Sequence, residues 1–338
     1  MGTFVVVLAL VLLGPAALFA IGLAFNRPVR RVPATVADDP TLPRVTIDGV
    51  TFHAETRGDP RRPVIVVIHG GPGGDYRNLR VLEALADEYF VVFYDQRGTG
   101  LSPRVPTAEL TFDGAIDDLH RVVLHYGRGS PVALIGHSWG GMMAAYYATR
   151  RPELVARAVL AEPGVLTDAE LEAFVGLMRL KMTPRLLWYL AGALLQSLRV
   201  RGPDSDASRD YLVERMMHAP GEDNALNRYW CGGVAPAAAL DTWRVGARAM
   251  QAIQGATAQA DGRMRMPPLN PAAYTRELLF LASRCNTLIG VERQRAHAAM
   301  FPDARVEIVE DAGHLMFTDQ PEASLAAVRR YLAAWPQG

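Results

Sequence analysis

The sequence predicts an α/β fold with a mostly parallel sheet and helices on both of its faces. Short continuous apolar runs alternate with helix-length segments in the first half of the chain, and the alternation returns near the end. Such runs are typical of strands buried on both faces, and strand–helix alternation favours parallel pairing. Between the two alternating parts, residues 163–272 show helical patterns and no evident core strand, which indicates an inserted helical cap.

The core segments before the cap are separated by short turns. Two short apolar runs flank Asp48-Gly49, a pair that favours a tight hairpin turn. The later segments have the lengths of buried strands and of amphipathic helices. In chain order we expect strands at 45–47, 51–54, 64–68, 90–94, 132–135 and 156–161, and helices at 76–87, 115–126 and 142–148.

The cap pattern is followed by a second part of the core. Apolar residues recur at helical spacing over 175–181, 185–200, 209–218 and 240–256. Strands are then expected at 278–282 and 306–309, and helices at 292–300 and 321–334. We therefore divide the chain into a core of residues 44–162 and 273–338 and a cap of residues 163–272. We expect most large apolar cap residues in the cap interior, with the lining of an apolar substrate pocket as the alternative, for Trp188, Tyr189, Met216, Met217, Tyr229, Trp230, Trp243 and Met250.

The N-terminal region has a different character. Residues 4–25 form an unbroken apolar run with Gly and Pro, long enough to cross a bilayer. No Lys or Arg precedes the run and no clean cleavage site closes it, whereas a secretory signal usually has both. Arg27, Arg30 and Arg31 follow it, and positive charge on that side favours the cytoplasm.

We therefore expect residues 1–26 to be a single-pass membrane anchor, with the catalytic domain on the cytoplasmic side. The alternative is export, either after signal cleavage or as an anchored periplasmic or surface enzyme. The Pro-rich residues 27–43 are expected to form a semi-rigid linker.

The composition excludes several classes of function. Thirty-five basic residues balance 35 acidic ones, so no charge excess favours nucleic-acid binding. Cys231 and Cys285 are the two cysteines, too few for a disulfide framework or a cysteine metal cluster, and the sequence does not decide whether they form one bridge. The sequence gives no indication of oligomeric state.

A nucleophile elbow is the strongest chemical signal. Residues 136–140 read Gly-His-Ser-Trp-Gly, after a predicted strand and before a predicted helix. This strand–turn–helix context is where a G-x-S-x-G serine acts as a nucleophile, because the tight turn exposes its hydroxyl above the sheet. Ser138 is therefore the expected nucleophile for attack on a carbonyl carbon.

A serine nucleophile requires a base and donors for the oxyanion. His314 follows the last predicted strand directly, so we expect it to be the base. The glycine-rich loop 69–74 follows the strand at 64–68 and lets backbone N–H groups approach a ligand closely. Pro72 has no N–H, so the expected oxyanion donors are the N–H groups of Gly71 and Trp139.

Three motifs together resemble the α/β-hydrolase fold family, and within it the proline iminopeptidase group of serine peptidases. They are His-Gly-Gly-Pro-Gly-Gly at 69–74, Asp-Gln-Arg-Gly-Thr-Gly-Leu-Ser at 95–102 and Gly-His-Ser-Trp-Gly-Gly at 136–141. The resemblance covers residues 44–162 and 275–336. It implies acyl transfer through a serine ester, with no metal and no cofactor. We expect residues 95–102 to be structural.

The acid of the predicted triad departs from that group. Its usual aspartate, after the strand at 278–282, is replaced here by Asn286. An asparagine accepts a hydrogen bond from histidine but does not offset the charge of the imidazolium. Glu162 ends the strand at 156–161, where related haloalkane dehalogenases and some lipases place their acid. We therefore expect Glu162 to be the acid, with Asn286 as the alternative position.

The cap departs from the group as well. Proline iminopeptidases hold the free amino group of their substrate with acidic cap residues, but the comparable stretch 227–233 contains no glutamate. We therefore expect a serine hydrolase that cleaves an ester or amide of a small molecule or peptide. A carboxylesterase for apolar esters and a non-catalytic membrane-tethered binding protein are the alternatives. Epoxide or haloalkane hydrolysis on this fold requires an aspartate nucleophile, which Ser138 disfavours.

Overall fold

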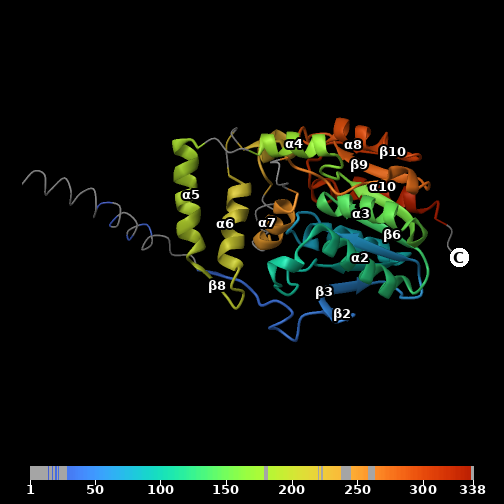
Figure 1. Cartoon of the computed structure of the whole chain (residues 1–338), viewed down its shortest axis with the longest axis horizontal. Helices are drawn as coiled ribbons and strands as arrows, with labels where there is room; N and C mark the ends of the chain where they lie inside the picture. Colours follow the sequence, from blue (N-terminus) through green and yellow to red (C-terminus); the bar gives the residue numbers. More distant parts are fainter. Residues whose placement is uncertain are drawn as a thin grey trace, which may run out of the picture.

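The structure, a computed structural model, describes residues 29–178, 182–219, 221, 224–236, 245–257 and 263–335, with four isolated positions between 14 and 22. Within these residues, an eight-stranded sheet lies at the centre in the order β10-β9-β7-β6-β4-β5-β3-β2. Helices cover both faces of the sheet (Figure 1). The predicted α/β architecture is confirmed.

The strands follow the predicted apolar runs. Strands β5 to β10 of the sheet pair in parallel with each other and with β4, whereas β3 is antiparallel to both β2 and β5. Asp48 and Gly49 have φ angles of 48° and 79°, as the two-residue hairpin turn requires. The strands are β2 (Arg44–Ile47), β3 (Val50–Arg57), β4 (Val64–Ile68), β5 (Phe90–Tyr94), β6 (Val132–His137), β7 (Val155–Ala161), β9 (Leu278–Ser283) and β10 (Ala304–Val309).

Two sets of helices cover the sheet. Helices α2 (Phe112–Gly127), α3 (Trp139–Arg150) and α8 (Val291–Ala298) contribute to the apolar cluster on one face. The other face is covered by the 3-10 helix η1 (Tyr76–Asp87) and by α9 (Met316–Asp319) and α10 (Pro321–Leu332). Short 3-10 turns lie at η2 (Thr107–Glu109), η3 (Pro152–Leu154) and η7 (Pro271–Ala273).

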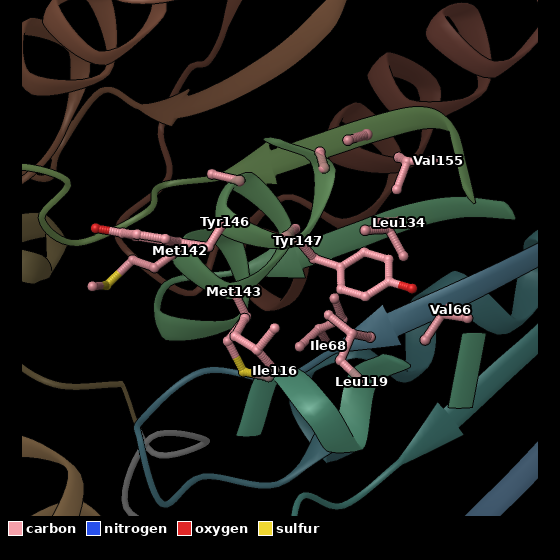
Figure 2. Packing of buried hydrophobic residues seen from close by; sticks show 14 of the residues in the cluster. Val66, Ile68, Ile116, Leu119, Leu134, Met142, Met143, Tyr146, Tyr147 and Val155 are labelled. Atoms are coloured by element: carbon pink, nitrogen blue, oxygen red, sulfur yellow. The ribbon is translucent and has the colours of Figure 1, made fainter. Parts of the chain in front are cut away.

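The core explains why the strand sequences are continuously apolar. Alternate residues of one strand belong to the two different clusters: Val66 and Ile68 of β4 face one, Ile65 and Val67 the other. Figure 2 shows the first cluster, where Met143 and Tyr147 of α3 and Ile116 and Leu119 of α2 pack near Ile68. A strand buried on both faces has no position for a polar side chain.

The strand order positions the functional loops. From β4 the chain continues to β5 on one side, and later to β6 on the other side. Ligands bind in such sheets outside the carboxyl ends of the strands, at the point where the order reverses. The glycine-rich loop 69–74 after β4 and Ser138 after β6 therefore lie beside each other at that point.

The cap elements are α4 (Asp168–Leu177), α5 (Pro184–Ser197), α6 (Ala207–Met217), η4 (Ala225–Tyr229), η5 (Cys231–Gly233) and α7 (Ala247–Gly255). Helices α5, α6 and α7 stand side by side at one end of the molecule (Figure 1). The helix predicted at 175–181 overlaps only the end of α4, which starts earlier because Thr167 and Glu170 form a capping box, and residues 179–181 lie outside the described residues. The helix predicted to reach residue 200 ends at Ser197, since Val200–Arg201 forms the short strand β8.

The segment predicted as a linker contacts the rest of the chain. Strand β1 (Arg30–Arg31) pairs in parallel with β8, and Val36 is fully buried. The Val36 N–H donates to the Leu101 carbonyl at 2.9 Å. Among the described residues, no helix is long and apolar enough to span a membrane. The predicted anchor at residues 4–25 lies almost wholly outside them and stays a prediction.

Candidate active site

The elbow serine sits on a constrained backbone. Ser138 has φ 56° and ψ −118° between β6 and α3, a conformation that side-chain-bearing residues adopt only where the surrounding structure imposes it. A Cβ at Gly136 would come within 2.2 Å of the Gly140 carbonyl oxygen, and one at Gly140 within 2.0 Å of the Ile68 carbonyl oxygen. Both flanking glycines are therefore required for the turn that exposes Ser138.

His314 lies in the loop after β10 and is largely buried. Its Nδ1 is 2.7 Å from Oε2 of Glu162, and the carboxylate accepts this hydrogen bond. The proton is thus on Nδ1, which leaves the Nε2 lone pair available as a base. The backbone N–H of His314 donates to the Tyr229 carbonyl at 2.8 Å.

Glu162 directly follows β7 and is fully buried, with a positive φ of 47°. Its Oε1 accepts hydrogen bonds from the N–H and the hydroxyl of Ser283, at 2.7 and 2.5 Å. Its Oε2 accepts from Asn286 Nδ2 at 2.7 Å, in addition to His314. A buried carboxylate is stable only with such donors around it. Asn286, the residue in the usual acid position, here hydrogen-bonds to Glu162 rather than to the histidine.

The Asn286 side chain is fixed in this orientation. Its Oδ1 accepts from the N–H groups of Leu288 and Ile289, at 3.0 and 3.1 Å. The amide can therefore present only its nitrogen to Glu162. No sequence signal connected Asn286 to Glu162, because the contact joins residues 124 positions apart.

His137, next to Ser138, also contacts His314. Its Nε2 is 2.7 Å from the His314 carbonyl oxygen, so this nitrogen carries the proton and donates. Burial, together with the nearby His314, lowers the pKa of His137 to about 3. His137 is therefore neutral at physiological pH and positions the His314 backbone.

Ser138 and His314 are brought to the same place by these contacts. The Ser138 N–H donates to the Ala161 carbonyl at 2.8 Å, and the next residue is Glu162. The rings of His137 and His314 have centroids 4.6 Å apart. Among the hydrogen bonds of the described residues there is none between the Ser138 hydroxyl and His314 Nε2. Catalytic hydrogen bonds are often long in a ligand-free site and shorten when substrate binds.

The glycine-rich loop lies against Ser138. A Cβ at Gly70 would come within 3.1 Å of Ser138 Cβ, and Gly71 has a φ of 135°. Trp139 is the first residue of α3, where the N–H has no acceptor within the helix. Within the described part of the chain, no acceptor is recorded for the N–H of either Gly71 or Trp139. Both predicted oxyanion donors are thus free for a ligand oxygen.

The segment 95–102 supports this loop. Asp95 accepts hydrogen bonds from His53 Nδ1 and from the Leu101 N–H, both at 2.8 Å. Gln96 donates to the His69 carbonyl at 3.0 Å and accepts from the Trp139 indole at 2.9 Å. These contacts connect the loop after β5 to both sides of the oxyanion site, in agreement with the structural role expected for it.

A cap segment closes over the histidine. The Tyr229 ring stacks on the His314 ring, with centroids 4.3 Å apart and planes 15° from parallel. Two residues later, Cys231 forms a disulfide with Cys285 of the core, which precedes Asn286. The segment 229–231 is thus fixed to the core beside the site. From the sequence alone, the two cysteines made one bridge possible but did not show that it forms.

Two further residues of the predicted cap region, Glu170 and Trp188, have other surroundings. Glu170 hydrogen-bonds to His297 Nε2 at 2.9 Å and lies 3.5 Å from Arg293. It is therefore engaged between α4 and α8 and is not free to bind a substrate amine. Trp188 lies in neither the cap interior nor a pocket, since it is 83% exposed. Trp243 lies outside the described residues.

No group of three or more potential metal ligands occurs among the described residues. A cavity of about 460 Å³ is lined by Arg157, Glu277 and Trp335 among others. It lies near the amino ends of strands β7, β9 and β10, whereas Ser138 follows the carboxyl end of β6.

Known proteins that are similar to this chain share the α/β architecture described above. A model of the α/β hydrolase fold family matches residues 63–321. The chain is 24% identical over 281 residues to the sn-1-specific diacylglycerol lipase ABHD11 of Mus musculus, covering 82% of this chain and 83% of that protein. It is 35% identical over 132 residues to a proline iminopeptidase of Xylella fastidiosa, covering 38% of this chain and 41% of that protein.

Epoxide hydrolase 4 of Homo sapiens is 31% identical over 153 residues, covering 43% of this chain and 42% of that protein. Among solved structures, VinJ matches with a TM-score of 0.63 at 21% identity, covering 87% of this chain and 98% of VinJ. The structural match shows the fold alone. The similar proteins named here have different activities, so the substrate must be argued from the site.

Proposed function

This chain belongs to the α/β-hydrolase fold family, and on that premise we propose that it is a serine hydrolase acting on an ester or amide through an acyl-enzyme. The observation that carries the proposal is the 2.7 Å hydrogen bond between His314 Nδ1 and buried Glu162, beside an elbow serine. A carboxylate in that place holds the histidine in the tautomer that accepts the serine proton.

In the first half of the reaction, Ser138 Oγ attacks the carbonyl carbon while His314 Nε2 takes its proton. The N–H groups of Gly71 and Trp139 stabilise the negative oxygen of the tetrahedral intermediate. Glu162 offsets the charge of the imidazolium. The intermediate collapses, and the leaving alcohol or amine takes the proton from Nε2.

In the second half, water attacks the acyl carbon of the Ser138 ester and gives its proton to His314. The second tetrahedral intermediate releases the carboxylic acid, and the proton returns to Ser138 Oγ. The free enzyme is thereby restored, and neither half requires a metal or a cofactor.

Labelling with a fluorophosphonate probe tests this proposal. We expect the purified chain to be labelled and Ser138→Ala not to be. Absence of labelling in folded wild-type protein contradicts the proposal and favours a non-catalytic binding protein. Circular dichroism of both proteins shows whether they are folded.

Within this proposal, an apolar ester is a better substrate than an N-terminal prolyl peptide. A peptidase of the proline iminopeptidase group needs an acidic group for the substrate amine, and Glu170 is already paired with His297 and Arg293. A panel of prolyl amides and p-nitrophenyl esters of increasing chain length separates the two. Faster turnover of the prolyl amides would contradict the esterase assignment.

The cellular location is a further part of the proposal. The apolar run 4–25 supports a membrane anchor, and Arg27, Arg30 and Arg31 favour a cytoplasmic catalytic domain. The Cys231–Cys285 disulfide supports the exported alternative, since disulfides persist in oxidising compartments. Alkylation of the two thiols in intact cells, before and after reduction, distinguishes these locations. Thiols that react only after reduction indicate export.

A further inference from the structure

Helix α5 has both buried and exposed apolar residues. Helix α5 packs on α6, and its residues Leu186 and Ala193 are buried. The exposed residues form a stripe at helical spacing that continues just past the end of the helix and is largely open to solvent: Leu187 is 49% exposed, Trp188 83%, Leu194 47% and Leu198 42%. Soluble proteins rarely expose a contiguous apolar surface of this kind unless it binds something.

The helix does not need a partner on this stripe to hold its own position. Thr183 caps its first turn through the Leu186 N–H at 3.2 Å. Tyr211 of α6 donates to Gln196 of α5 at 2.6 Å, and Ser208 donates to the Ser197 carbonyl at 2.7 Å. The contacts that hold α5 in place therefore do not involve the exposed stripe.

Two described parts of the N-terminal region lie near α5. Strand β1 (Arg30–Arg31) pairs with β8, three residues after α5 ends. Within the run, a Cβ at Gly22 would come within 2.9 Å of Leu195 Cδ1 on α5. Gly22 and strand β1 thus lie at the same end of the molecule as the α5 stripe.

The charges at that end are basic. Arg30, Arg31, Arg201 and Arg209 are exposed there. The nearby acids Asp206 and Asp210 are buried, and each lies within 3.2 Å of an arginine nitrogen. An apolar stripe with an exposed Trp, bordered by arginines, is the pattern of a helix that lies in the interface of an anionic bilayer.

We propose that the exposed stripe of α5, formed by Leu187, Trp188, Leu194 and Leu198, lies in the surface of a membrane that contains anionic phospholipid. The Trp188 ring occupies the headgroup level, where Trp is enriched, and the leucines enter the acyl boundary. The exposed arginines bind the lipid phosphates. The cap is thereby held on the bilayer at a second point besides the predicted anchor. This inference does not depend on the proposed hydrolase activity.

Tryptophan quenching in vesicles tests the proposal with the full chain. The protein is reconstituted in phosphatidylcholine–phosphatidylglycerol vesicles that carry bromine on the acyl chains. We expect brominated lipid to quench wild-type emission and Trp188→Phe to lose most of that quenching. Because Trp188 is exposed, this substitution does not disturb the packing of the fold.

Trp335→Phe is the matched control. Trp335 stacks on Tyr89 and follows α10, a helix that lies at the end of the molecule opposite to α5 (Figure 1). We expect its removal to leave lipid quenching unchanged. Aqueous iodide provides the complementary measurement: in vesicles, the emission that depends on Trp188 should be protected from iodide.

Three results would overturn the proposal. Equal lipid quenching in wild type and Trp188→Phe would place this ring away from the acyl chains. Protection from both iodide and brominated lipid would show that protein covers the stripe, either residues 4–25 or a second copy. If quenching is as strong in vesicles of phosphatidylcholine alone as in vesicles with phosphatidylglycerol, at both low and high salt, then the arginines do not contribute by binding anionic lipid.

Discussion

Replacement of Glu162 by glutamine is the sharpest test of the site, because it changes one atom type and keeps the side-chain shape. The Glu162 carboxylate has two filled ends: Ser283 donates to Oε1, and Asn286 and His314 donate to Oε2. A glutamine must point its NH₂ at one of these ends. At the Oε1 end the Ser283 hydroxyl can turn to accept, but the Ser283 N–H loses its partner. At the Oε2 end the Asn286 amide cannot accept, and His314 Nδ1 accepts only if its proton moves to Nε2, the nitrogen that is expected to take the Ser138 proton.

The magnitude follows from the charge that is lost. His314 becomes an imidazolium during the reaction, 2.7 Å from a carboxylate with no exposed side-chain surface. At an effective dielectric constant of about 20, the attraction is about 6 kcal/mol. At about 1.4 kcal/mol for each tenfold change in rate, that is an upper bound near four orders of magnitude. We expect Glu162→Gln to lower kcat by about 10³- to 10⁴-fold, as loss of a triad acid does elsewhere.

Asn286→Ala is the matched comparison. It removes one of the four donors to Glu162 but leaves the charge and the His314 contact. Since that donor binds the carboxylate in the ground state and the transition state alike, we expect kcat to fall by about tenfold at most. Steady-state hydrolysis of a p-nitrophenyl ester, with melting temperatures as a fold control, measures both. Equal and small losses, or a larger loss in Asn286→Ala, would refute the assignment of Glu162 as the acid.

Three further predictions concern the cap. Tyr229→Ala should lower kcat by about three- to tenfold, through loss of the ring stack on His314, whereas Tyr229→Phe should keep wild-type kcat; equal losses in both would contradict a role for stacking. Cys231→Ser opens a bridge between residues 54 positions apart and should cost up to about 4 kcal/mol of stability, measured by urea unfolding, with unchanged stability as the contrary result. Burial opposes ionisation of Glu170, but the hydrogen bonds from His297 and Leu166 outweigh it and lower its pKa to about 2. Because this pKa lies below the unfolded value, ionised Glu170 should stabilise the fold at pH above about 4.5, and this stabilisation should be lost as pH falls towards about 2. The stability difference between wild type and Glu170→Gln should narrow over that window, and a difference independent of pH would contradict it.

The sequence by itself determined the sheet and the elbow turn at Ser138. Strands such as Val64–Ile68 and Phe90–Tyr94 have the predicted bounds, because burial on both faces requires a continuous apolar run. The elbow at Ser138 and the glycines around it are equally local, since the turn depends on residues within a few positions of each other. The class of the fold and the place of the elbow serine can therefore be predicted from short windows of sequence.

The contacts around His314 were decided only by the tertiary structure. Glu162, Ser283 and Asn286 come from two strand ends more than 120 residues apart, and only the β7–β9 pairing makes them neighbours. The sequence predicted Glu162 and Asn286 as alternative positions for the acid. It did not predict that Asn286 donates a hydrogen bond to Glu162. The cap shows the same limit: helical spacing identifies an apolar face of α5, yet whether that face is buried depends on which elements pack against it.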